Sequence, residues 1–288
     1  MPWIWLCLLP ALMGQSPAPK SDSASQPAAR SKREQLMEIY GNDAASYTIY
    51  RDASRKERVE LEREPVFNWT NVLGAGDEYG AVFVWTCRGR VELVGTIFSF
   101  PENGQRKLCH EFHSLSLRTL DVSRSGSSPW IPEAPGIELS PIPGAPAPAT
   151  SAPRRLVQMR ALAHDFSAST KDLKERRWEL RLLPQPLSRY QSTDPDVLDG
   201  AVFAFVTSAG TDPEALLVVE AQTPPAGGST IWQYAVCRFT DLNLWVRHKG
   251  KEVFFVPLVP YDSPRQDPKQ RYHVFLDRWI PPIEDKTP

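Results

Sequence analysis

Short apolar runs separated by turn-forming residues dominate the chain, and six of them fall into two sets of three. The runs are 80–86, 91–100 and 108–117 in the first set, and 200–207, 216–221 and 231–240 in the second. Runs of this length that are rich in Val, Phe, Trp and Ile are typical of β-strands, and loops of a few residues join antiparallel neighbours. The pattern therefore predicts two three-stranded β-meanders.

The two predicted meanders begin with the same four residues. Gly-Ala-Val-Phe occurs at Gly80 and again at Gly200, each time after an acidic loop. In both copies an aromatic residue follows after one further position, Trp85 in the first and Phe205 in the second. This recurrence indicates an internal repeat of one β unit; the alternative is a chance recurrence on two ordinary strands.

One amphipathic helix is predicted between the two sets. Ser151 and Pro153 fit the N-cap and first-turn positions, and four apolar residues then recur at helical spacing. These are Leu156, Met159, Leu162 and Phe166. We expect a helix at about 153–167 whose apolar stripe packs on the sheet, with Arg155 on the solvent side.

Further strand patterns lie on both sides of the meanders and decide the fold class. Apolar and polar residues alternate at 47–49, 59–61 and 178–182, and Lys249-Gly250 lies between two apolar runs as the tip of a hairpin. Roughly ten to thirteen strands against one clear helix indicate an α+β fold, mainly antiparallel β. A sheet of that size is expected to curl or to split into two packed sheets.

The N-terminal part of the chain differs from the rest. Trp3 to Met13 are almost wholly apolar, a stretch too short to span a bilayer as a helix but of the length found in secretory signals. We predict a signal peptide at 1–18 and a flexible tether at 19–45 that contains a possible short helix ending at Gly41. The expected location is secreted or periplasmic; the alternative is a buried or disordered tail.

Composition narrows the class of partner. With 41% apolar residues, 23% charged residues and a net charge of −1, the chain has no electrostatic attraction to nucleic acid. Eight of its 28 prolines lie in 129–153, which predicts a semi-rigid connector. We expect one β-rich domain at 46–288, divided into a first unit at 46–128 and a helix with a second unit at 154–288. We also expect a monomer without a transmembrane segment in the mature chain.

Three cysteines remain once the predicted signal is removed: Cys87, Cys109 and Cys237. In a meander, Cys87 ends the first strand and Cys109 begins the third, which separates them by about 20 Å along the strands. A disulfide needs α-carbons within about 7 Å. The sequence therefore predicts three buried free thiols.

Few residues form a recognisable chemical set. On the strand at 108–117, alternation places Cys109, Glu111 and His113 on one face in steps of about 6.6 Å, and His110 on the opposite face. Thiol, carboxylate and imidazole groups are zinc ligands, so this face is a candidate metal trio with Glu111 and His113 as candidate catalytic residues. The alternative is an ordinary polar face of a sheet. The chain has no phosphate-binding loop or nucleophile elbow, and no cofactor is expected.

Several segments resemble an uncharacterised family of secreted bacterial proteins. They are Arg63–Val66, Trp69–Asn71, His110–Leu115, Pro143–Pro148, Met159–Leu162, Leu183–Pro186 and Asp194–Phe205. The resemblance covers about half of the chain. The family has no known activity and no assigned site, so the resemblance implies no function.

Two functional hypotheses follow from the sequence. The first is an exported, non-enzymatic module that binds an unknown protein or small-molecule ligand through its loops or its sheet. The second is a metal-assisted hydrolase that uses Glu111 and His113, together with Cys109 or an acidic loop. Stoichiometric zinc that is lost on His113→Ala would favour the second.

Overall fold

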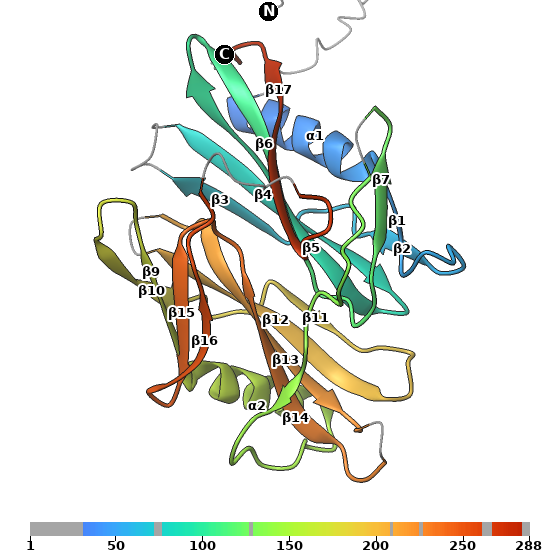
Figure 1. Cartoon of the computed structure of the whole chain (residues 1–288). Helices are drawn as coiled ribbons and strands as arrows, with labels where there is room; N and C mark the ends of the chain where they lie inside the picture. The colour runs from blue at the N-terminus through green and yellow to red at the C-terminus, as the bar shows by residue number, and fades with distance from the viewer. Residues whose placement is uncertain are drawn as a thin grey trace, which may run out of the picture.

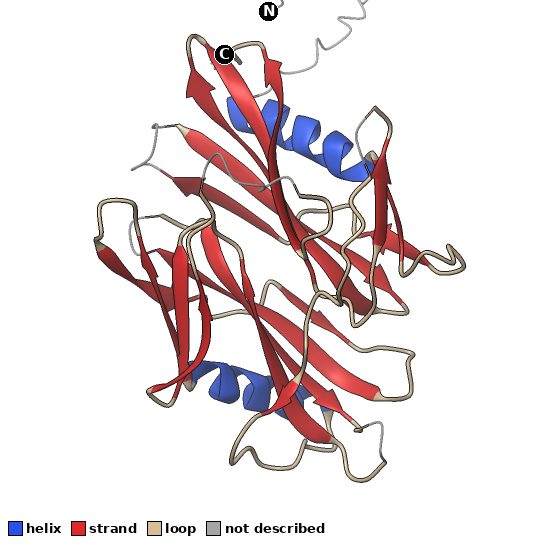
Figure 2. Cartoon of the chain, in the orientation of Figure 1, coloured by secondary structure: helices blue, strands red, loops and turns tan. Residues whose placement is uncertain are grey.

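Two antiparallel β-sheets lie face to face, and one helix covers the outer face of each sheet (Figures 1 and 2). The computed structural model describes residues 31–71, 77–126, 129–207, 210–224, 227–260 and 267–283. The layers follow in the order α1 (Lys32–Ala45), first sheet, second sheet and α2 (Ala152–His164). This confirms a mainly antiparallel α+β fold with two packed sheets. The predicted signal peptide and most of the predicted tether lie outside the described residues.

The first sheet has the strand order β17-β6-β5-β4-β2-β1-β7, with β3 paired to the remaining part of β4. Its strands are β1 (Tyr47–Tyr50), β2 (Arg58–Leu61), β3 (Phe67–Asn71), β4 (Glu78–Cys87), β5 (Arg90–Glu102), β6 (Gln105–Ser114), β7 (Asp121–Arg124) and β17 (Tyr272–Ile280). The sequence placed β17 with the second unit, but β17 pairs with β6 of the first. The C-terminal strand therefore ties the end of the chain to the first unit.

The second sheet has the order β16-β15-β9-β10-β12-β13-β14-β8, with β11 paired to β12. Its strands are β8 (Ser140–Pro141), β9 (Phe166–Lys171), β10 (Arg177–Leu182), β11 (Ser188–Tyr190), β12 (Val197–Thr207), β13 (Pro213–Gln222), β14 (Ile231–Arg238), β15 (Asn243–His248) and β16 (Lys251–Val256). The strands β4–β5–β6 and β12–β13–β14 are the two predicted meanders.

The central strands are apolar on both faces because both faces are covered. On β4, Phe83 and Trp85 point toward α1, whereas Val82 and Val84 point toward the second sheet. The same division holds on β12, where alternate residues face α2 and the first sheet. A strand buried on both faces reads as a continuous apolar run rather than an alternating one, which is why these strands stood out in the sequence.

Both halves of the chain use one order of pairing. A helix is followed by six strands, in which the first pairs with the second, the second and third both pair with the fourth, and the fourth to sixth form the meander. In each half the glycine of Gly-Ala-Val-Phe lies opposite an aromatic residue of the short third strand, Gly80 opposite Trp69 and Gly200 opposite Tyr190. A Cβ at Gly80 would lie 2.2 Å from Trp69 Cε2, and one at Gly200 would lie 2.5 Å from Tyr190 Cε2. Each glycine therefore leaves room for an aromatic ring.

The first helix is longer than the sequence predicted. Ser31 and Glu34 form a capping box at its start, and the helix continues through Gly41 to Ala45. Glycine inside a helix costs about 1 kcal/mol relative to alanine. Tyr40 and Ala44, on either side of Gly41, are fully buried against the first sheet, and this packing outweighs the low helix propensity of glycine.

The second helix is shorter than predicted and buries one residue that was expected to face solvent. It ends at His164, and Phe166 begins β9 instead. Met159 and Leu162 are buried against the sheet as predicted. Arg155 is also buried, which corrects the prediction, because its Nε donates to Asp199 Oδ2 on β12 at 2.8 Å. A charged side chain enters the apolar layer here because it is paired there.

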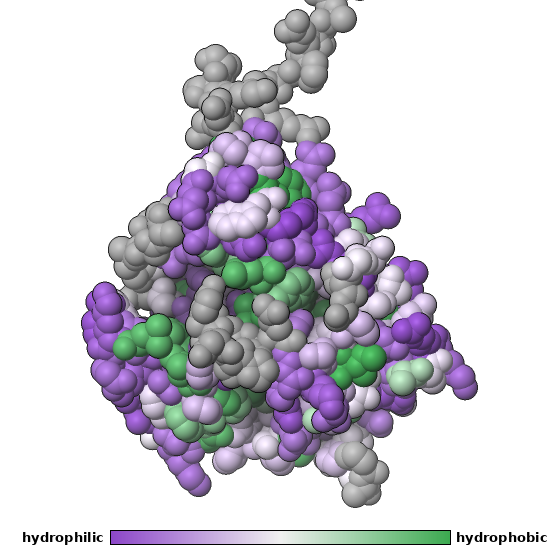
Figure 3. Space-filling view, turned by 45° about the horizontal axis from the view of Figure 1, so that its top comes forward, coloured by the Kyte–Doolittle hydropathy of each residue, from purple (hydrophilic) through white to green (hydrophobic). Residues whose placement is uncertain are grey.

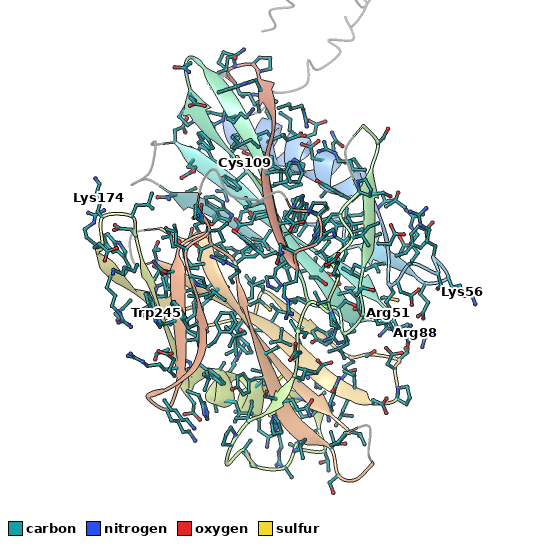
Figure 4. The ribbon with its side chains drawn as sticks, viewed as in Figure 1. Arg51, Lys56, Arg88, Cys109, Lys174 and Trp245 are labelled. Atoms are coloured by element: carbon teal, nitrogen blue, oxygen red, sulfur yellow. The ribbon has the colours of Figure 1, made fainter. Side chains whose placement is uncertain are left out.

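Ion pairs join the two sheets. Arg90 on β5 donates to both carboxylate oxygens of Glu220 on β13, at 3.0 and 3.1 Å, and both side chains are almost fully buried. At the edge of the interface, Arg51 and Arg88 lie close together (Figure 4) and both bind Asp194, at 2.9 and 2.8 Å. None of the described helices is long and apolar enough to cross a membrane.

Candidate ligand-binding site

A cavity of about 670 Å³ opens where the curled second sheet brings its two edges together, and we call it the large cavity. Its lining includes the part of β14 that starts at Tyr234 and the part of β16 that starts at Val253. The segment after β16, as far as Pro260, and His113 and Tyr272 of the first sheet also belong to it. The volume is in the range of small-molecule sites. The large cavity is therefore big enough to enclose a ligand of that class.

The large cavity lies where the second sheet lacks a long edge strand. In the described residues β8 pairs with β14 only at Gln233 and Tyr234. In the first sheet, β17 pairs with the corresponding strand β6 from Arg106 to His113. The part of β14 after Tyr234 consequently faces the cavity, and Val236 and Arg238 contribute to its wall.

The lining of the large cavity combines apolar side chains with two cations. Val236, Val253 and Phe254 are among the apolar residues. Arg238 is fixed in place, because it donates to the carbonyl oxygens of Thr240 and Leu242 at 2.8 and 3.1 Å and stacks 5.1 Å from the Tyr272 ring. Arg271 lies 3.9 Å from the exposed carboxylate of Glu138 and is itself partly exposed. The lining thus holds two cations and one acid.

The predicted site residues Glu111 and His113 lie beside this cavity. Glu111 Oε1 accepts a hydrogen bond from the Tyr272 hydroxyl at 2.7 Å. Burial raises the pKa of Glu111 to about 8, so the carboxyl group is largely protonated at neutral pH. Burial lowers the pKa of His113 to about 4, so the imidazole is neutral, and its Nδ1 lies 2.8 Å from the Ser114 carbonyl oxygen. At neutral pH, therefore, neither Glu111 nor His113 presents a full charge to a ligand in the cavity.

The structure does not bring Cys109, Glu111 and His113 together as one set of ligands. Within the described residues, the group of His, Cys, Asp and Glu side chains whose ligand atoms lie within 4.8 Å of one another is Asp43, His110 and Asp277. Burial raises the pKa of Cys109 to about 12, so this residue is a neutral thiol. Cys87, Cys109 and Cys237 are all buried and free. The predicted trio shares a face of β6, but its side chains spread along the strand.

A second, smaller cavity of about 360 Å³ lies between the edge strands β7 and β17 of the first sheet. Its lining includes the aromatic side chains of Tyr47, Phe112, Trp130 and Phe275, together with Arg124 and Asp277. The sequence did not reveal this region because its residues come from β1, β6, β7, β17 and the loops between them. The one sequence signal for this part of the molecule was strand alternation, which places the His110 side chain on the face of β6 opposite to that of His113.

The buried neutral state of His113 predicts a pH-dependent loss of stability. Its pKa is about 4 in the folded protein against an ordinary value of 6.5, so between these values the unfolded chain binds more protons. The stability that His113 contributes is therefore fully present above pH 6.5 and is lost as the pH falls to about 4. The gap between the two pKa values corresponds to about 3 kcal/mol.

Urea denaturation of the wild type and of His113→Gln at several pH values measures this effect. The free energy of unfolding of the wild type should fall relative to that of the variant by about 3 kcal/mol between pH 6.5 and 4. The comparison cancels the opposite contribution of Glu111, which both proteins share. Two parallel curves would show that His113 protonates freely in the folded protein.

Comparison with protein-family models, with curated proteins and with solved structures finds no match to this chain. The functional argument therefore rests on the geometry of the two cavities.

Proposed function

We propose that this protein is an exported, non-enzymatic β-rich module that binds a small amphipathic anion in the large cavity. The observation that carries the proposal is that the lining combines apolar side chains, among them Val236, Val253 and Phe254, with two arginines, Arg238 and Arg271. A ligand with a hydrocarbon body and a single carboxylate or similar head group matches both kinds of side chain.

The titratable groups of the cavity support binding rather than catalysis. A general acid or base works best with a pKa near the operating pH and a reachable proton. The carboxyl group of Glu111 is buried and accepts a hydrogen bond from the Tyr272 hydroxyl. The pKa of His113 is too low for base chemistry at pH 7. Arg238 is held by two backbone carbonyls. These contacts build a rigid wall and leave Arg271 as the adjustable cation.

The exposed surface is compatible with a ligand that enters from solvent. Figure 3 shows several patches of apolar side chains among polar ones on one face of the molecule. Part of the cavity lining is itself accessible, because Pro257 and Pro260 at the end of β16 are exposed. The part of the lining that follows β16 is therefore open to solvent.

Export and duplication complete the proposal. The apolar stretch Trp3 to Met13 and the Pro/Ser/Ala-rich segment after it support a signal peptide at 1–18 and a tether that ends where α1 begins, at Lys32. The shared order of pairing, and the matched contacts of Gly80 with Trp69 and of Gly200 with Tyr190, support an ancestral repeat of one helix-plus-six-strand unit. Of the cavity lining, β14 belongs to the second copy of this unit, whereas β16, His113 and Tyr272 lie outside that copy.

Fluorescence titration with anilinonaphthalene sulfonate, followed by displacement with laurate, tests the binding proposal. The wild type should bind one equivalent of each. Val253→Trp, which fills the apolar part of the lining, should weaken laurate binding at least tenfold, and Arg271→Gln should weaken binding of laurate but not of the uncharged dodecanol. Val157→Trp is the matched control, because Val157 is 65% exposed on α2.

Two results would contradict the proposal. In one, Val253→Trp binds laurate as tightly as Val157→Trp does, which would place the ligand elsewhere. In the other, Arg271→Gln weakens the binding of dodecanol and laurate equally, which would remove the selection for an anion.

A further inference from the structure

Three side chains from distant parts of the sequence converge at the edge of the first sheet. They are Asp43 near the end of α1, His110 on β6 and Asp277 on β17. His110 Nε2 lies 3.5 Å from Asp43 Oδ2 and 3.8 Å from Asp277 Oδ2. His110 is completely buried and Asp43 is 6% exposed. A nitrogen and two carboxylate oxygens thus face one point inside the protein.

The distances between these atoms match those between metal ligands better than those of hydrogen bonds. An N–H···O hydrogen bond has a donor–acceptor distance of about 2.7–3.2 Å, and within the described residues the buried Nε2 atom of His110 has no hydrogen-bond partner. Tetrahedral zinc with bonds of about 2.1 Å separates neighbouring ligand atoms by about 3.4 Å. We propose that Asp43, His110 and Asp277 form a binding site for a divalent metal ion of the zinc type.

Surrounding side chains hold the three proposed ligands in position. The Tyr47 hydroxyl lies 2.7 Å from His110 Nδ1, which fixes the ring and leaves Nε2 directed at the carboxylates. Arg124 donates to Asp43 Oδ1 and to Asp277 Oδ1, both at 3.1 Å, and more weakly to Asp277 Oδ2 at 3.4 Å. The second oxygen of each carboxylate lies toward His110. Partners of this kind, which orient the ligands from behind, are a regular part of metal sites.

A cation already lies against this site in the structure. Arg278 Nη1 is 3.1 Å from Asp43 Oδ2 and 2.6 Å from Asp277 Oδ2, the two oxygens that face His110. The side chain of Arg278 is 44% exposed, so it can swing into solvent at little cost. With Arg278 displaced, two carboxylates and one remaining arginine leave a net negative charge for the incoming metal ion. Arg278 therefore competes with the metal.

The fold itself does not require these polar residues. The strand register places Cys109 and Gln233 at corresponding positions of the two meanders, so His110 corresponds to Tyr234. Tyr47 begins β1 as Phe166 begins β9. Asp43 lies two residues before the end of α1, as Leu162 does in α2. At these three positions the second half carries Tyr234, Phe166 and Leu162, and its nearby carboxylate, Asp165, lies beside His248 and Lys249. The fold therefore does not require an acidic residue at the position of Asp43.

The metal ion would lie next to the small cavity. Asp277 is both a proposed ligand and part of the lining of the smaller cavity, and Tyr47, which contacts His110, also lines it. Zinc sites with three protein ligands keep a position for water or a small ligand. We therefore expect the fourth ligand to be a water molecule or a small anion on the cavity side.

Calorimetric titration of the metal-stripped full chain with Zn²⁺ at pH 7.5, in competition with a chelator of known affinity, tests the site. The wild type should bind one equivalent. Asp277→Asn and His110→Gln should each weaken binding at least tenfold, and Arg278→Ala should tighten it severalfold because the competing cation is gone. His248→Gln is the matched control, since His248 Nε2 lies 4.0 Å from Asp165 in the second half without a second carboxylate.

The variants separate metal binding from folding. Thermal melting without metal shows which variants are folded. Asp277→Asn should disturb the core least, because Asp277 lies on the edge strand β17. The proposal is overturned if neither the wild type nor Arg278→Ala binds one equivalent of Zn²⁺, or if folded Asp277→Asn binds as tightly as the wild type. Laurate binding plays no part in these measurements, so failure of the ligand proposal leaves this one standing.

Discussion

Replacement of Arg90 by methionine is expected to lower the free energy of unfolding by about 3–5 kcal/mol. The guanidinium of Arg90 is 1% exposed and pairs through two hydrogen bonds with Glu220, which is fully buried. Arg90 Nη1 also donates to the Leu115 carbonyl at 2.9 Å and lies 3.6 Å from the buried carboxylate of Glu92. Methionine fills the space but leaves two carboxylates and the carbonyl oxygens of Val91 and Leu115 without this partner.

Urea denaturation of single and double variants isolates the contribution of charge. Arg90→Met/Glu220→Met should recover part of the lost stability, because a buried pair replaced by apolar residues is often close to neutral. Glu179→Gln is the control, since it removes an exposed partner of Arg177 and should leave the unfolding midpoint unchanged. A double variant as unstable as the single one would show that volume or backbone contacts, not the unpaired acid, cause the loss.

Replacement of Leu162 by alanine is expected to cost about 2–5 kcal/mol through lost apolar burial and the cavity left behind. Leu162 is 6% exposed and belongs to the cluster in which α2 packs on Phe203 and Phe205 of β12. Val157→Ala is the matched control on the same helix, because Val157 is 65% exposed. Thermal and urea denaturation should separate the two variants clearly. Equal stabilities would mean that the α2 stripe does not hold the helix to the sheet.

The parts of the fold that the sequence predicted are those that depend on local pattern. The two meanders followed from apolar runs, and the hairpin between β15 and β16 followed from Lys249-Gly250, whose φ values of 49° and 82° are those of a tight hairpin turn. The face of α2 that carries Met159 and Leu162 followed from helical spacing. In each case neighbouring residues determine the structure.

The parts that the sequence did not predict depend on partners far along the chain. Arg155 is buried because Asp199 on β12 pairs with it, which no helical periodicity can show. The continuation of α1 past Gly41 depends on packing against the first sheet. β17 joins the first sheet although 157 residues separate its first residue, Tyr272, from Leu115 just after β6, so the convergence of His110 with Asp277 follows from tertiary pairing alone.

The same limit applies to the candidate sites. Strand alternation correctly grouped Glu111 with His113, and both lie near the large cavity. Alternation could not show that the cavity exists, because it arises from the short pairing of β8 with β14 and from the curl that brings β16 nearby. Arg238 and Arg271, which give the cavity its positive charge, lie in segments that carry no motif.

A structure of the full chain with laurate bound is the most direct measurement of the central claim, that the large cavity holds an amphipathic anion. The account predicts one laurate per chain, with its hydrocarbon tail between Val236 and Val253 and its carboxylate within hydrogen-bonding distance of Arg271. A bound laurate that lies elsewhere, or a large cavity that stays empty at a saturating concentration of laurate, would contradict it.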